Sequence, residues 1–125
     1  MIGGFDNLNK RIIVAIEETL LIHNSNGEQV WCIGGIETKN KRIRLQLIKQ
    51  RNTAAISNFV YSNFLEGTHF VHDTWIGYNF LNNNINYTHE IHVHGGGDFG
   101  IGYHSTSHIE NYWARLKKKL YVFME

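Results

Sequence analysis

Histidines crowd into one stretch near the end of the chain. Residues 89–108 hold five of the eight histidines, namely His89, His92, His94, His104 and His108. His92 and His94 alternate along an expected strand and so share one face, and imidazoles are good ligands for zinc, iron or copper. With the glycines and Asp98 that follow, the pattern is faintly similar to the metal motif of a cupin barrel. The alternative is a group of exposed histidines on an edge strand that bind no metal.

Carboxylates occur in three segments that are expected to form strands or helices. Glu17 and Glu18 lie in the middle of an apolar segment, and Asp73 lies near the end of a short one. Asp73 could also be a helix-start residue, because aspartate caps helices well. Glu110 comes three residues after Ser107, an arrangement that a helix-capping box explains without any metal.

Two basic stretches could hold phosphates. Arg42, Arg44 and Lys49 lie along one expected strand, and Arg115 together with residues 117–119 lines an expected helix. Such stretches are more often solvated faces than binding sites. The formal net charge is only +1, so any nucleic-acid-binding surface would have to be a local patch.

Length and composition indicate one folded domain. The chain has 125 residues, of which 42% are hydrophobic, and this is enough for one modest core. Cys32 is the only cysteine, which excludes an internal disulfide and a zinc ribbon and favours a reducing compartment. The sequence shows neither a secretory signal nor an apolar run long enough to cross a membrane. We therefore expect an intracellular protein, in the nucleus of a eukaryote or otherwise in the cytoplasm.

Periodicity predicts the elements that position these residues. Residues 11–22, with a short helix as the competing interpretation, and then 30–38 and 42–47 are expected to form an antiparallel strand meander. Gly34 and Gly35 indicate a bulge or a close approach of the backbone.

The second half alternates helices and strands. We expect a helix at 53–65, a strand at 68–74, a short helix at 75–82, a strand at 87–94, a glycine-rich loop at 95–102 and a helix at 108–123. The last helix carries one apolar stripe, made of Ile109, Trp113, Leu116 and Leu120. The order β-β-β-α-β-α-β-α is that of an α/β RNase H-like fold with a mixed sheet of about five strands.

Several segments share motifs with one known family. Residues 14–19 read V-A-I-E-E-T, residues 30–37 read V-W-C-I-G-G-I-E, residues 72–78 read H-D-T-W-I-G-Y, and residues 109–117 read I-E-N-Y-W-A-R-L-K. They resemble the V-E-I-D-E-S/T, V-F-G-G-I-E-R, D-x-W-x-A-Y and I-E-x-x-W-x-x-x-K motifs of DDE-type transposases of the ISXO2-like group, which are related to Merlin transposons. His94 falls on a further family position, a histidine that follows the strand after the D-x-W motif.

The resemblance implies a chemistry and a site. Such transposases cut and join DNA strands with two divalent cations, Mg²⁺ or Mn²⁺, held by three carboxylates. By position these would be Glu17, Asp73 and Glu110, and Lys117, on the same face of the last helix as Glu110, could touch a phosphate. The implied partners are DNA, at transposon ends in the family, and further copies of the chain in a homo-oligomer. The bland alternative for Lys117 is a solvated side chain.

Departures from the family pattern predict a weakened enzyme. Glu17 stands where the family has aspartate, and the extra methylene moves the carboxylate by about 1.5 Å, whereas a working site tolerates about 0.5 Å. Ser107 and Val93 replace asparagines, and no N-terminal DNA-reading module is visible. We expect residues 1–125 to be a single catalytic-like domain, degenerate or domesticated, with little cleavage. The alternative is a non-catalytic domain that binds nucleic acid or protein.

Overall fold

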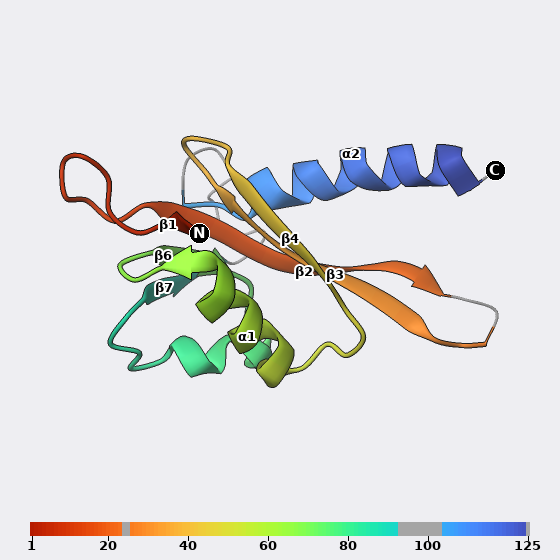
Figure 1. Cartoon of the computed structure of the whole chain (residues 1–125), viewed down its shortest axis with the longest axis horizontal. Helices are drawn as coiled ribbons and strands as arrows, with labels where there is room; N and C mark the ends of the chain where they lie inside the picture. Colours follow the sequence, from red (N-terminus) through yellow and green to blue (C-terminus); the bar gives the residue numbers. More distant parts are fainter. Residues whose placement is uncertain (24–25, 93–103, 125) are drawn as a thin grey trace.

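A five-stranded mixed sheet is the centre of the molecule (Figure 1). The computed structural model describes residues 1–23, 26–92 and 104–124. The strands, in the spatial order β4-β3-β2-β6-β7, are β2 (Ile13–His23), β3 (Gln29–Glu37), β4 (Ile43–Ile48), β6 (His69–His72) and β7 (Thr88–Ile91). β2, β3 and β4 pair in antiparallel fashion, while β6 pairs parallel to both β2 and β7. The expected meander and the two later strands are therefore confirmed.

Helices cover both faces of this sheet. α2 (Ser107–Met124) lies across one face, and α1 (Thr53–Asn63) lies on the opposite face with the 3₁₀ helix η1 (Ile76–Leu81) (Figure 1). Each face has its own core, because side chains alternate along a strand. Val14 and Ile16 of β2 join the larger core beneath α1, whereas Ala15 joins the smaller core beneath α2. None of the described helices is long and apolar enough to cross a membrane.

The glycine pair of β3 makes room on each face. A Cβ atom at Gly34 would lie 2.7 Å from the Trp113 ring of α2, and one at Gly35 would lie 2.5 Å from the Phe64 ring. Both distances are below normal van der Waals contact, so only glycine fits without a shift of these rings. The expected close approach is confirmed. The bulge alternative is wrong, since the β2–β3 register is regular here and shifts only between Leu20 and Ile22.

The apolar stripe of α2 packs as expected where its side chains are described. Ile109 and Trp113 are buried, and the half-buried Leu116 packs against the same small core, which also contains Ala15 and Cys32. The side chain of Leu120 lies outside the described residues. The stripe fixes the rotation of α2 about its axis and thereby the direction of its polar side chains.

An extra pair of short strands ties the N-terminus to the body. β1 (Ile2–Gly3) pairs in parallel with β5 (Phe64–Leu65), which follows α1 directly. The fully buried Glu37 accepts hydrogen bonds from the Gly3 amide and from Arg42, each at 2.9 Å. Burial raises the pKa of Glu37, but these hydrogen bonds outweigh it and leave the pKa lowered. Two-residue strands have no periodicity, so the sequence did not predict this pair.

Element boundaries differ in detail from the expectations. The helix expected to end at residue 65 ends at Asn63, and residues 76–81 form a 3₁₀ helix rather than an α-helix. The strands expected at 68–74 and 87–94 are shorter, at 69–72 and 88–91. His94 and the glycine-rich loop expected at 95–102 lie outside the described residues.

Candidate carboxylate site beneath helix α2

Glu17 points into the layer between the sheet and α2. It pairs across the strands with Gly34, and the Trp113 ring stands over that glycine. The side chain is therefore partly buried, and its Oε2 atom has no hydrogen-bond partner in the described part of the chain. Burial raises the pKa of Glu17 to about 8, and the negative charges of Glu110, Glu18 and Asp73 contribute to the rise in that order. A buried carboxylate without a donor holds its proton until a cation compensates the charge.

Asp73 comes to the same face from the neighbouring strand. Ala15 pairs with Val71 in the parallel β2–β6 ladder, so two residues further along, Glu17 and Asp73 stand at matching levels. One oxygen of Asp73 accepts a hydrogen bond from the Trp75 amide at 3.0 Å, which turns the chain into η1. The helix-start interpretation is wrong, since the N-cap of η1 is Trp75 and no described side chain caps it. The hydrogen bond of this one oxygen is compatible with a role for the carboxylate in the site.

A histidine stack holds the backbone at Asp73. The buried His72 contacts the Asp73 carbonyl through Nδ1 at 2.6 Å and His89 through Nε2 at 2.7 Å. Because a carbonyl only accepts, Nδ1 of His72 carries the proton there. The His72 ring also stacks on Tyr78, with ring centroids 4.5 Å apart. Burial lowers the pKa values of His72 and His89, so the stack is neutral at physiological pH.

Helix α2 brings the third carboxylate and a lysine. Glu110 lies in its first turn, where its Oε1 accepts a hydrogen bond from the Thr106 hydroxyl at 3.3 Å. The charge of Glu110 is the largest electrostatic contribution to the raised pKa of Glu17, after burial itself. Lys117, two turns on, acts on the same carboxyl in the opposite sense. The four residues that the motifs single out are therefore in electrostatic contact through Glu17.

These motifs identify the family. The ISXO2-like transposase domain family matches residues 3–124. The chain belongs to this family. Among curated proteins, no sequence matches the chain significantly.

Solved structures similar to this ISXO2-like domain are retroviral integrases. A chain of the simian T-cell lymphotropic virus intasome, in complex with PP2A regulatory subunit B56 gamma, aligns over 98% of this chain with a TM-score of 0.64 and 14% identity. The catalytic core domain of BIV integrase aligns over 90% of this chain and 70% of its own, with a TM-score of 0.56 and 14% identity. The fold is thus RNase H-like, and the chain spans 45% of the length of the intasome protein.

This fold overturns one alternative. A cupin is an all-β barrel, whereas the ISXO2-like domain has an open mixed sheet with helices on both faces. The histidines that suggested a cupin are also divided. His89 contacts His72 on the α1 face, and His104 lies on the α2 face with His69 and Glu90.

A second buried carboxylate, next to the first, was missed at the level of sequence. Glu18 faces α1, and its side chain is 1% exposed. Arg51 donates to its Oε1 at 2.5 Å, and the Tyr78 hydroxyl donates to its Oε2 at 2.5 Å. Arg51 is held between the rings of Trp75, at 4.1 Å from the centroid, and Trp31, at 5.3 Å. Trp75 and Tyr78 are the aromatic positions of the D-x-W-x-x-Y motif, which was the available signal.

Proposed function

We propose that this domain acts on DNA phosphodiesters as a DDE-type transposase domain, with divalent cations held by Glu17, Asp73 and Glu110, and that its cleavage is impaired. The observation that carries the proposal is the state of Glu17. This carboxylate has no hydrogen-bond donor on Oε2 among the described residues, and two further carboxylates from distant parts of the chain raise its pKa. Such a concentration of negative charge opposes folding unless a cation relieves it.

The residues present fit Mg²⁺ or Mn²⁺ in kind. All three side chains offer carboxylate oxygens, which are the ligands that these hard cations prefer. The buried Oε2 of Glu17 is an unsatisfied acceptor of the sort that a cation would occupy. Bound cations would supply Lewis-acid activation of the phosphodiester and of the attacking nucleophile. The chain itself orients these ligands through β2, the β6–η1 turn and α2.

Lys117 has a separate role in this proposal. Its positive charge lowers the pKa of Glu17, so it favours the ionised form that a cation needs. Lys117 is only partly buried on α2, on the same face as Glu110. We infer that its ammonium group meets a phosphate of the DNA strand and places that strand beside the carboxylates.

Two properties of Glu17 explain the impaired cleavage in this proposal. Glutamate places its carboxylate about 1.5 Å further from the strand than aspartate does, and misplacement by 1 Å can cost about a hundredfold in rate. In addition, a pKa of about 8 means that Glu17 is mostly protonated at neutral pH. Cation binding must then expel that proton, which lowers the apparent affinity about tenfold at pH 7.

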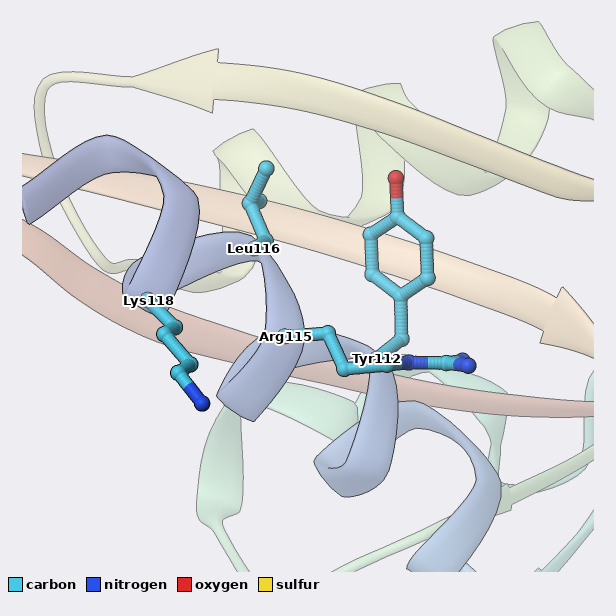
Figure 2. Close-up of a pocket in the computed structure, with 4 residues that line it drawn as sticks. All are labelled: Tyr112, Arg115, Leu116 and Lys118. Carbon is cyan, nitrogen blue, oxygen red and sulfur yellow. The ribbon is translucent and has the colours of Figure 1, made fainter. Parts of the chain in front are cut away.

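The second candidate is a domain that holds nucleic acid without cutting it. Lys41 lies in the turn between β3 and β4. Its pKa is lowered mainly by burial and then by the positive charge of Arg115 on α2. Arg115 also borders a shallow depression with Tyr112, Leu116 and Lys118 (Figure 2). Cationic and aromatic groups from two elements thus meet on one surface, and this combination suits phosphates and bases.

Nicking of supercoiled plasmid DNA in Mn²⁺ tests the proposal. We expect weak nicking by the purified chain, an increase with Glu17→Asp and complete loss with Asp73→Ala. Glu66→Gln, an exposed carboxylate away from the site, is the matched control and should leave nicking unchanged. Circular dichroism spectra of the variants check that each is folded.

The outcomes separate the two candidates. Robust cleavage by the unaltered chain would refute the impairment, and nicking that survives Asp73→Ala would remove the site assignment. If no variant nicks DNA, then fluorescence anisotropy with a labelled duplex in EDTA decides for or against the second candidate. Binding that weakens several-fold in Arg115→Ala supports that candidate, and binding unaffected by it contradicts it.

A further inference from the structure

A second group of metal-ligand side chains lies on the α2 face, at the β6–β7 edge of the sheet. His69 of β6, Glu90 of β7 and His104, just before α2, each offer one ligand atom, and these atoms all lie within 4.8 Å of one another. Oε2 of Glu90 is 2.6 Å from Nε2 of His69 and 2.7 Å from Nδ1 of His104. None of the three belongs to the carboxylate site proposed above.

The sheet register brings the first two together. His69 pairs with Thr88, and Val71 pairs with Glu90, in the parallel β6–β7 ladder. Paired residues share a face, so His69 and Glu90 are diagonal neighbours beneath the segment that leads into α2. The rings of His69 and His104 lie with centroids 5.8 Å apart and tilted by 60°. The two rings are therefore not stacked, and one nitrogen of each points at the same oxygen of Glu90.

The donor set selects a class of metal. Two imidazoles and one carboxylate suit Zn²⁺ and similar transition-metal ions, whereas Mg²⁺ prefers oxygen ligands alone. Three protein ligands leave one position of a tetrahedral ion for water. We propose that His69, Glu90 and His104 form a Zn²⁺-type site that is distinct from the carboxylate site beneath α2.

A neighbouring hydroxyl supports the ligand role of His69. Nδ1 of His69 lies 2.7 Å from the Thr88 hydroxyl oxygen. Metal-ligating histidines almost always use their second nitrogen in such a contact, which fixes the ring orientation. A hydroxyl can both donate and accept, so it serves His69 with its proton on either nitrogen. The ring therefore need not move when Nε2 exchanges its proton for a metal ion.

The site has a structural consequence for the carboxylates. Ser105 and Thr106 are buried directly after His104, and Thr106 donates to Glu110. A metal ion held by two strands and His104 would fasten the start of α2 to the edge of the sheet. Since α2 carries Glu110, metal loading at the edge would restrict the positions available to the third carboxylate.

Titration of the full chain with Co²⁺, followed by its visible absorption, and with Zn²⁺ by calorimetry tests this site. Excess Mg²⁺ is present throughout to occupy all-oxygen sites. We expect one equivalent to bind with the intense absorption of a four-coordinate ion. Glu90→Gln and His104→Ala should each weaken binding at least tenfold, because each removes one of three ligands. His108→Ala, a histidine of α2 outside the group, and Asp73→Asn, in the carboxylate site, should stay within twofold.

Each outcome bears on the proposal alone. Binding that is unchanged in both ligand variants overturns it, and so does binding that Asp73→Asn abolishes, since the ion would then occupy the carboxylate site. The side chain of His104 is 56% exposed, so its removal should not prevent folding, and this variant decides the matter if Glu90→Gln fails to fold. DNA nicking is not part of the readout, so failure of the proposed function would leave this result standing.

Discussion

Replacing Glu17 with glutamine should stabilise the metal-free protein at alkaline pH. The pKa of this carboxyl is about 8 in the fold, against an ordinary value of 4.5 in an unfolded chain. A group whose pKa is raised by folding contributes stability that is fully present below its unfolded value. This stability is lost progressively as the pH rises to the folded value. The unaltered protein should therefore lose stability between pH 4.5 and about 8, whereas Glu17→Gln has no such carboxyl to ionise.

The size of the effect follows from the shift. Each pKa unit corresponds to about 1.4 kcal/mol, so a rise from 4.5 to about 8 sets an upper limit of roughly 5 kcal/mol. Glu17 is only partly buried, and solvent screening reduces this to about 2–3 kcal/mol. The free energy of unfolding in urea, measured in EDTA from pH 5 to pH 9, should then diverge between the two proteins by this amount.

Subtraction of the two curves isolates Glu17, because both proteins share every other titrating group. Glu18→Gln is the matched control, since it replaces the same residue type one position away. Glu18 accepts hydrogen bonds from Arg51 and Tyr78, so its replacement should destabilise the protein instead. Added Mg²⁺ should restore stability to the unaltered protein at pH 8.5 and have little effect on Glu17→Gln. Parallel curves from pH 5 to pH 9 would refute the raised pKa and the charge repulsion behind it.

Three further changes test the packing that supports the site, each by urea unfolding at pH 7. Tyr78→Phe leaves the buried Glu18 oxygen without its 2.5 Å donor, and it should lower the free energy of unfolding by about 1–3 kcal/mol; a smaller loss would mean that water replaces the hydroxyl. Gly34→Ala places a Cβ atom 2.7 Å from the Trp113 ring, so it should cost about 1–3 kcal/mol and shift tryptophan fluorescence, and an unchanged spectrum would contradict the close packing. Glu37→Gln removes a fully buried charge that makes four hydrogen-bonded contacts. It should lower the free energy of unfolding by about 1.5–3 kcal/mol. Faster hydrogen exchange at the N-terminal strand β1 would show that the loss comes from these contacts.

Periodicity predicted the order of elements because burial is periodic. The helical stripe on 108–123 packs its apolar face as expected. The alternation along 42–47 also predicted its strand correctly, although Leu45 and Leu47 on its apolar face are exposed. The 3₁₀ winding of residues 76–81 was not predictable in the same way. Over six residues, the periods of a 3₁₀ and an α-helix place apolar side chains at nearly the same positions.

Site residues divide according to whether a local motif marks them. Asp73 and Glu110 stand within aromatic-rich motifs shared with the family, so the sequence singled out both as candidates. His69 and Glu90 are 21 residues apart and meet only through the register of two parallel strands. Register depends on the whole sheet, and no spacing along the chain encodes it. The raised pKa of Glu17 likewise depends on burial under α2, which begins 90 residues later.

The two adjacent glutamates of β2 lie in opposite surroundings, and this difference supports the proposed cation site. Strand alternation sends Glu18 to the α1 face, where arginine and tyrosine donors satisfy it, and Glu17 to the α2 face, where like charges surround it. If residue 17 had only a structural role, a neutral or apolar side chain would be the more stable choice there. A carboxylate with a raised pKa costs stability at neutral and alkaline pH, and such a cost is typical of a site that binds a cation. Glu17→Gln should therefore raise the stability of the metal-free protein and also abolish the stabilisation of the protein by Mg²⁺. A cation site predicts both effects together, whereas a packing defect at residue 17 predicts no change in the effect of Mg²⁺.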